Sequence, residues 1–166
     1  MSEEIFITLG SQKFQFNRLL KAIDRLCENK IINSEDVFAQ IGYSDYLPQY
    51  YNYKKFLDRE EFDNQMRRAK IVITHGGTGA IIGAVKKGKK VIAVPRLAKY
   101  GEHVDNHQIQ IINEFEKLDM INACKDMDLA KSIEIVNMSD YVKYKSNSLK
   151  IIENIERYIE GDKWKK

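Results

Sequence analysis

The sequence predicts an α/β domain in which helices cover both faces of a parallel sheet. Short runs rich in apolar and β-branched residues alternate with segments whose apolar residues recur at helical spacing. This alternation is typical of parallel strands joined by right-handed crossovers. The 166 residues, interrupted by only two prolines, have the usual length of one domain, so we expect a single domain over residues 1–166.

Each element is predicted from its local pattern. Strands are expected at residues 5–9, 36–41, 50–57, 71–74, 91–94 and 120–124, where apolar or aromatic residues form short runs. The first helix carries Leu19, Leu20, Ile23 and Leu26 at helical spacing. Further helices are expected at residues 60–69, from Thr78 or Gly79 onward, and at 105–118, 128–135 and about 148–160.

Composition excludes several classes of protein. The net charge of +3 is too small and too evenly spread to indicate a nucleic-acid partner. Cys27 and Cys124 stand far apart, which fits a reduced cytosolic protein and offers no metal site. The sequence has no basic leader and no apolar run near the length of a membrane span. We therefore expect a cytoplasmic protein, with any membrane contact made at the periphery.

In such sheets ligands bind beyond the carboxyl ends of the strands, which directs attention to the loops at residues 10–15, 75–79 and 95–107. The second loop reads His75, Gly76, Gly77, Thr78, Gly79 and joins a buried strand to a helix. Its glycines allow a sharp turn and close approach of a ligand, and the helix behind it presents unpaired amides suited to phosphate. It matches neither GxGxxG nor a Walker A loop, so it is either a phosphate site or a tight turn. His75 either donates to a phosphate or sugar hydroxyl, or is a hydrogen-bonded residue at the strand end.

The other two loops also carry polar residues. Gly10 and Ser11 follow the first strand, where Ser11 either caps the next helix or binds phosphate. The long third loop is dense in side chains that form hydrogen bonds: Arg96, His103, Asp105, Asn106, His107 and Gln108. Asp105 and Asn106 are candidate helix caps, His107 and Gln108 candidates for reading sugar hydroxyls. Arg96 and His103 either offset diphosphate charge or are solvated.

Metal and nucleophile chemistry are not predicted. The triplet Asp126, Met127, Asp128 has the form of a metal-binding DxD, but it stands where a helix cap is expected and no other carboxylate joins it. We therefore expect neither a metal nor another cofactor.

Taken in order, these loops resemble the donor-binding C-terminal domain of GT-B glycosyltransferases, the group that contains MurG. The likeness is greatest to its small stand-alone members, the PssE-like exopolysaccharide enzymes and the Alg13 subunit. It is carried by LGSQ at 9–12, ITHGGTGAII at 73–82, VPR at 94–96 and EHVDNHQ at 102–108, and it extends over residues 5–113. The implied fold is Rossmann-like, equivalent to the C-terminal half of a GT-B enzyme.

The resemblance implies an inverting transfer from a UDP-sugar without a metal. Gly10 and Ser11 would touch phosphate, Phe56 and Leu57 would lie against the base, and the loop from His75 to Gly79 would hold diphosphate and ribose. His107 and Gln108, in the DNHQ segment, would contact the sugar. Family members often have an acidic residue that binds ribose where this sequence has Gly83, so ribose must be recognised differently here.

The resemblance also implies a partner. Full-length relatives have an N-terminal acceptor domain, whereas stand-alone relatives pair with a PssD-like or Alg14-like membrane-associated subunit that binds a polyprenyl-diphosphate-linked acceptor. We expect the general base on that partner, with His75 as the internal candidate, and the isolated chain could self-associate through the exposed partner surface. The expected role is capsular or exopolysaccharide repeat-unit synthesis. The alternative is a non-catalytic nucleotide-sugar-binding or regulatory subunit.

Overall fold

Six parallel strands form one sheet, in the order β3-β2-β1-β4-β5-β6. The computed structural model describes residues 4–142, 150, 153–155 and 157. The strands are β1 (Ile5–Thr8), β2 (Val37–Gln40), β3 (Asn52–Lys54), β4 (Ile71–His75), β5 (Lys90–Val94) and β6 (Asn122–Ala123). The helices are α1 (Asn17–Glu28), α2 (Arg59–Arg68), α3 (Thr78–Lys86), α4 (His107–Lys117) and α5 (Leu129–Met138), with short 3-10 turns η1 (Ser34–Asp36) and η2 (Ala98–Tyr100). The predicted α/β fold is confirmed, and its strand order is that of a Rossmann-like sheet.

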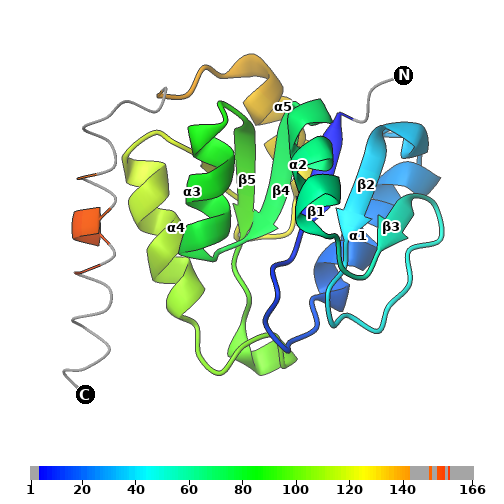
Figure 1. Ribbon diagram of the computed structural model, residues 1–166, viewed down its shortest axis with the longest axis horizontal. Coiled ribbons are helices and arrows are strands. Elements are labelled where there is room, and N and C mark those ends of the chain that lie inside the picture. The colour runs from blue at the N-terminus through cyan, green and yellow to red at the C-terminus, as the bar shows by residue number, and fades with distance from the viewer. Residues whose placement is uncertain (1–3, 143–149, 151–152, 156, 158–166) are drawn as a thin grey trace.

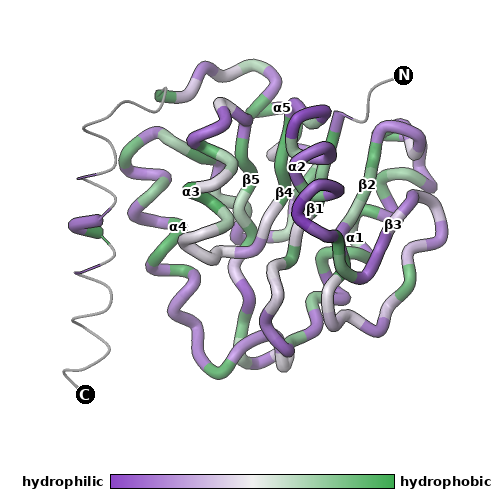
Figure 2. Tube along the Cα trace, in the orientation of Figure 1, coloured by the Kyte–Doolittle hydropathy of each residue, from purple (hydrophilic) through white to green (hydrophobic). Residues whose placement is uncertain are grey.

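Helices cover both faces of the sheet (Figure 1). Successive side chains of a strand point to opposite faces. Ile5 and Ile7 of β1 therefore join the core under α1 and α5, whereas Phe6 joins the core under α2, α3 and α4. Figure 2 shows hydrophobic residues along β5 in the interior and a mostly hydrophilic α2 at the surface.

The boundaries of β3 differ from the prediction. Residues 50–57 were expected to be extended because they are aromatic, but only Asn52–Lys54 pair with β2. The backbone N–H groups of Gln49 and Tyr50 instead donate to the buried carboxylate of Asp24 on α1. That carboxylate binds the loop before the strand to α1, and β3 begins only at Asn52.

The predicted helix at about 148–160 lies mostly outside the described residues. Within that span, residues 150, 153–155 and 157 are described and are helical, and Ile155 packs against the core on the α2 side. In the part of the chain that the structure describes, no helix is long and apolar enough to cross a membrane.

The strand order places a switch point between β1 and β4. From β1 the chain proceeds to β2 and β3 on one side, and from β4 to β5 and β6 on the other. The connections therefore leave the sheet in opposite directions, and in folds of this kind ligands bind beyond the carboxyl ends of the strands at such a point. The loops after β1 and β5 lie side by side beyond this edge, at the bottom of Figure 1.

Candidate functional site

The side chain of His75 lies between two glycine loops at the switch point. A Cβ on Gly10 would lie 2.7 Å from His75 Nε2, and a Cβ on Gly77 would lie 2.2 Å from His75 Cε1. Gly10 also has φ +72°, a backbone conformation that side-chain-bearing residues rarely adopt. The glycines therefore make room for the imidazole, and they bring it to the edge where a ligand would bind.

Gln108 fixes the tautomer of this imidazole, that is, which ring nitrogen carries the proton. Its Oε1 accepts hydrogen bonds from the backbone N–H groups of Gly76 and Arg96, each at 3.0 Å. The amide nitrogen Nε2 therefore faces His75 Nδ1, at 3.3 Å, and must donate to it. His75 then carries its proton on Nε2, the atom beside Gly10.

Burial keeps His75 neutral. Only 7% of the residue is exposed, and this burial, with the charges of Arg96 and His103, lowers the pKa of His75 to about 3. A histidine with such a pKa is a poor proton acceptor at neutral pH. The low pKa disfavours His75 as the general base, and the contact with Gln108 favours a hydrogen-bond donor through Nε2.

The amino terminus of α3 lies directly after this histidine. Gly77 occupies the N-cap position and has no side chain with which to cap the helix, and the first intrahelical bond runs from Ile81 N to Gly77 O. The N–H groups of Thr78, Gly79 and Ala80 precede that bond, so the helix itself provides them no acceptor. A Cβ on Gly79 would meet no heavy atom within 4 Å in the described part of the chain. Amides, helix dipole and open space together suit an anion.

Arg96 has a different place from the one expected. It is 1% exposed, so it is not a solvated group, and its guanidinium donates to four carbonyl oxygens: those of Leu9, Phe14, Gln15 and Glu102. Burial lowers its pKa to about 10, which leaves it charged at neutral pH. The side chain is therefore bonded mainly to the loop after β1.

Gln108 also requires a correction. The residue is 4% exposed, and both ends of its amide are hydrogen-bonded to the protein. It ties the loops after β4 and β5 together, and its carbonyl oxygen already serves two backbone amides. Gly76 belongs to the same contact, because a Cβ there would lie 2.8 Å from Gln108 Cβ.

The residues just before Gln108 shape the start of α4. Asp105 Oδ1 accepts the N–H of His107 at 2.9 Å and so forms a turn just before α4, whose N-cap position is occupied by Asn106. Asn106 does not cap the helix: its Oδ1 accepts the N–H of Ala98 at 2.9 Å. His103 packs its ring 5.5 Å from that of Phe14 and lies 3.2 Å from Asp105, so it is not a solvated side chain either. His107 is the first residue of α4 and is partly buried, while Ser11 is exposed in the loop after β1.

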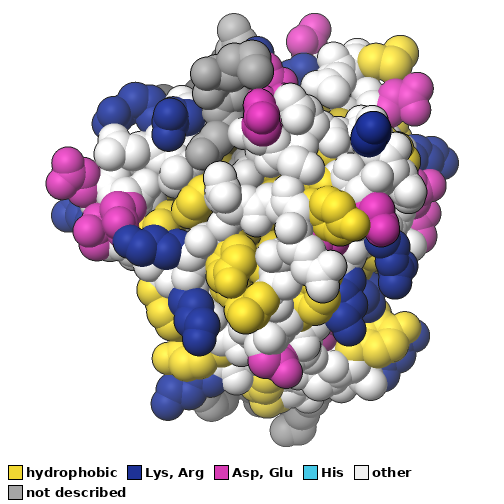
Figure 3. Space-filling model, turned by 90° about the vertical axis from the view of Figure 1, so that its right-hand side faces the viewer, with side chains coloured by type: hydrophobic (Ala, Val, Ile, Leu, Met, Phe, Trp, Pro, Cys, Tyr) yellow, Lys and Arg dark blue, Asp and Glu magenta, His cyan; other side chains and the backbone are white. Residues whose placement is uncertain are grey.

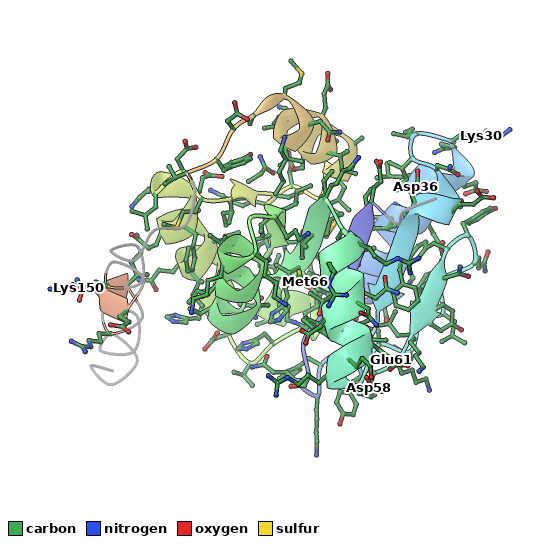
Figure 4. All side chains as sticks on the ribbon, turned by 45° about the horizontal axis from the view of Figure 1, so that its top comes forward. Lys30, Asp36, Asp58, Glu61, Met66 and Lys150 are labelled. Atoms are coloured by element: carbon green, nitrogen blue, oxygen red, sulfur yellow. The ribbon has the colours of Figure 1, made fainter. Side chains whose placement is uncertain are left out.

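Phe56 and Leu57 lie farther along the same edge, after β3. Phe56 is 45% exposed and packs edge-to-face on Tyr43, with ring centroids 5.1 Å apart, whereas Leu57 is partly buried. Asp58 follows as the N-cap of α2 and forms a capping box with Glu61, so these two side chains meet in Figure 4. Figure 3 shows hydrophobic side chains gathered on this side of the molecule. Its segments carry four large exposed hydrophobic residues: Tyr43, Leu47, Tyr50 and Phe56.

Two charged residues, Glu102 and Arg18, were not predicted from the sequence to contact each other near the loop after β5. Glu102 is 1% exposed, binds Arg18 of α1 at 2.9 Å and accepts the N–H of Leu97 at 2.9 Å. Arg18 has the pattern of an ordinary solvent-facing residue of an amphipathic helix, and it stands far from Glu102 in the sequence. No sequence signal could have paired them.

The Asp126–Asp128 triplet forms turns and a cap, as predicted. Asp128 accepts the N–H of Lys131 as the N-cap of α5, and Asp126 accepts the N–H of Asp128. Among the described residues, no group of three or more His, Cys, Asp or Glu side chains could hold a metal ion.

A match to a family model places the chain in a known class. The family described as "Glycosyltransferase family 28 C-terminal domain" matches residues 4–159, and the chain belongs to that family. The resemblance noted from the loops is thereby confirmed, and the GT-B fold with it.

Two relatives share the name UDP-N-acetylglucosamine transferase subunit ALG13. The chain is 30% identical to the protein of Yarrowia lipolytica over 79 residues, which is 48% of this chain and 38% of that protein. It is 24% identical to the human protein over 119 residues, 68% of this chain and 10% of that protein. The chain thus spans well under half the length of either relative.

Solved structures share the fold. The solution structure of ALG13 superposes with a TM-score of 0.57 at 17% identity and covers 95% of both chains. MurG of Acinetobacter baumannii superposes with a TM-score of 0.55 at 15% identity, over 84% of this chain and 42% of that one.

Proposed function

We propose that this chain is the donor-binding subunit of an inverting glycosyltransferase that uses a UDP-sugar. The observation that carries the proposal is a group of hydrogen-bond donors at the switch point, which we call the cradle. It consists of the uncapped start of α3 and neutral His75, whose Nε2 lies beside Gly10. Backbone N–H groups and a neutral donor bind a diphosphate without requiring a metal. The names of the ALG13 relatives support a UDP-linked sugar as the donor.

The cradle also supports a chemical role. As the bond between the sugar and UDP breaks, negative charge grows on the departing diphosphate. Donors held in place beforehand stabilise that charge more than mobile solvent would. In this proposal the amides of α3, the loop at Gly10 and Ser11, and His75 supply those donors. The acceptor hydroxyl loses its proton to a base outside this chain, because His75 is a poor acceptor.

The other parts of the donor are assigned to the edge at the carboxyl ends of the strands. His107 is proposed to contact the sugar, since it begins α4 and the carbonyl oxygen of Gln108 is already bonded to two backbone amides. Phe56 and Leu57 are proposed to lie against the base. Gly83 leaves open space on α3, because a Cβ added there would have no heavy atom of the described residues within 4 Å. Ribose is therefore proposed to be held by backbone groups.

The acceptor side is proposed to come from a second protein. A membrane-associated subunit resembling PssD or Alg14 would bind the polyprenyl-diphosphate-linked acceptor and bring this chain to the inner face of the membrane. Such a pair would build the repeat unit of a capsular or extracellular polysaccharide. The subunit name carried by the ALG13 relatives supports a division of labour between chains.

Calorimetric titration with UDP, in EDTA and in Mg²⁺, tests the proposal directly. We expect binding of equal strength in both buffers. His107→Ala should retain the affinity for UDP and lose the added affinity contributed by the correct sugar. A folded chain that does not bind UDP in either buffer would contradict the donor site.

A second measurement separates an enzyme from a non-catalytic binding subunit. The chain is mixed with its membrane-associated partner, a UDP-sugar and a polyprenyl-diphosphate acceptor, and release of UDP is followed. Transfer supports the enzyme. Binding of UDP without transfer in the complete mixture would favour the regulatory alternative.

A further inference from the structure

The buried side chain of Arg96 binds backbone carbonyls of the loop between β1 and α1, which contains Gly10. Its Nη2 donates to Leu9 O at 2.7 Å, and its Nη1 donates to Phe14 O and Gln15 O, each at 3.1 Å. These carbonyls belong to the beginning and the end of the loop between β1 and α1. One buried side chain that follows β5 thus holds both ends of a loop that follows a different strand.

The direction of these carbonyls fixes the direction of the amides. In a trans peptide the C=O and N–H groups point to opposite sides. Because Leu9 O points inward to Arg96, the N–H of Gly10 points away from it. The positive φ of Gly10 lets the chain turn immediately afterwards. The N–H of Gly10 is therefore directed away from Arg96 because this buried cation holds the carbonyl of the same peptide.

Glu102 and Arg18 hold this arrangement from the other side. Glu102 receives two hydrogen bonds from Arg18, at 3.0 Å to Nε and 2.9 Å to Nη2, and its own backbone carbonyl accepts from Arg96 at 3.3 Å. Arg18 also donates to Pro95 O at 3.3 Å. Such a two-point contact fixes orientation as well as distance. The helix α1, the loop after β1 and the loop after β5 are thus joined through one buried carboxylate.

We propose that Arg18, Glu102 and Arg96 form a positioning triad that sets the loop at Gly10 for the donor diphosphate without touching it. Arg18 is the residue that closes the triad, from a helix that carries no part of the glycine motifs. The inference rests on the proposed function, because it assigns Gly10 to the diphosphate. It predicts that losing Arg18 harms recognition of phosphate and spares recognition of the nucleoside.

The test compares UDP with uridine on Arg18→Met. The substitution retains most of the aliphatic stem and removes both hydrogen bonds to Glu102. We expect UDP to bind about tenfold more weakly, whereas uridine affinity, followed by NMR titration, changes by less than about twofold. Arg18→Lys, which retains the charge and loses the two-point geometry, should lie between the wild type and Arg18→Met. Arg25→Met is the matched control, since Arg25 is exposed on the same helix, and it should bind like the wild type.

A double variant separates positioning from stability. Arg18→Met leaves a buried carboxylate without its cation, which destabilises the fold. Adding Glu102→Gln removes that charge, so the unfolding temperature should recover toward that of the wild type while UDP affinity remains low. A double variant that binds UDP as tightly as the wild type would overturn the inference. So would an equal loss for UDP and uridine in Arg18→Met.

The failure of the inference and of the proposed function are distinguishable. If the wild-type chain does not bind UDP, the proposed function fails. The triad is then still tested by the amide resonance of Gly10 in the ligand-free protein, which should shift in Arg18→Met and not in Arg25→Met. An unchanged Gly10 resonance would show that Arg18 does not set this loop.

Discussion

Gly77→Ala tests how tightly His75 is held. The new Cβ would lie 2.2 Å from His75 Cε1, 2.9 Å from Nδ1 and 3.0 Å from Nε2. Non-bonded carbons are comfortable at about 3.5 Å or more, so the ring must move by about 1 Å. That movement stretches the contact with Gln108, which is 3.3 Å in the native arrangement.

The size of the effect follows from these contacts. Overpacking of this kind costs about 1–3 kcal/mol, and a weakened buried hydrogen bond adds about 1 kcal/mol. Alanine restricts the unfolded chain, which offsets about 0.4–1 kcal/mol. A net loss of about 1–4 kcal/mol lowers the unfolding temperature of a domain this size by roughly 2–16 °C.

Thermal unfolding followed by circular dichroism, with urea titration at 25 °C, measures this loss. Gly83→Ala is the matched control, because it lies within α3 and, among the described residues, has no heavy atom within 4 Å of the added Cβ. The control should gain about 0.5–1 kcal/mol from better helix propensity. If Gly77→Ala unfolded at or above the wild-type temperature, the imidazole would not be confined by this glycine.

Three other perturbations probe the same edge. Gly79→Ala should raise the unfolding temperature, because the helix gains propensity and the described residues leave its Cβ free, yet it should weaken UDP binding in calorimetry if the diphosphate approaches α3. Gln108→Met, similar in volume, leaves the buried backbone amides it serves without an acceptor and should cost about 2–5 kcal/mol in urea unfolding. His75 has a folded pKa of about 3, below its ordinary 6.5, so the unfolded chain binds the extra proton between these values. The stability due to neutral His75 is therefore complete above pH 6.5 and is lost as the pH falls toward 3, and His75→Phe should flatten the curve of unfolding free energy against pH.

Much of the fold could be predicted from the sequence because its signals are local. Apolar runs, helical spacing and glycine punctuation each act over a few residues, and they located the strands and helices. The edge strand β3 was shorter than predicted because Asp24, on another element, binds the backbone of the residues before it. An aromatic run indicates a strand but does not show which partner takes its amides.

The sequence predicted the position of the site better than it predicted the roles of individual residues. The rule that ligands bind at carboxyl ends of parallel strands singled out Gly10 and His75, and the structure brings them together. A sequence shows which side chains can form hydrogen bonds, but not which are already engaged. Arg96 and Gln108 were therefore assigned to a ligand, whereas the structure engages them within the protein.

The burial of Arg96 has a consequence for how the site responds to salt. Sites assembled from surface lysines lose affinity as counterions accumulate around the exposed charges. Here the cation beneath the glycine loop is 1% exposed, so counterions cannot gather around it. The remaining donors of the proposed cradle are uncharged amides and a neutral imidazole. Nucleotide affinity should therefore change little between low and physiological ionic strength, and binding would depend on the shape of the cradle more than on the ions in solution.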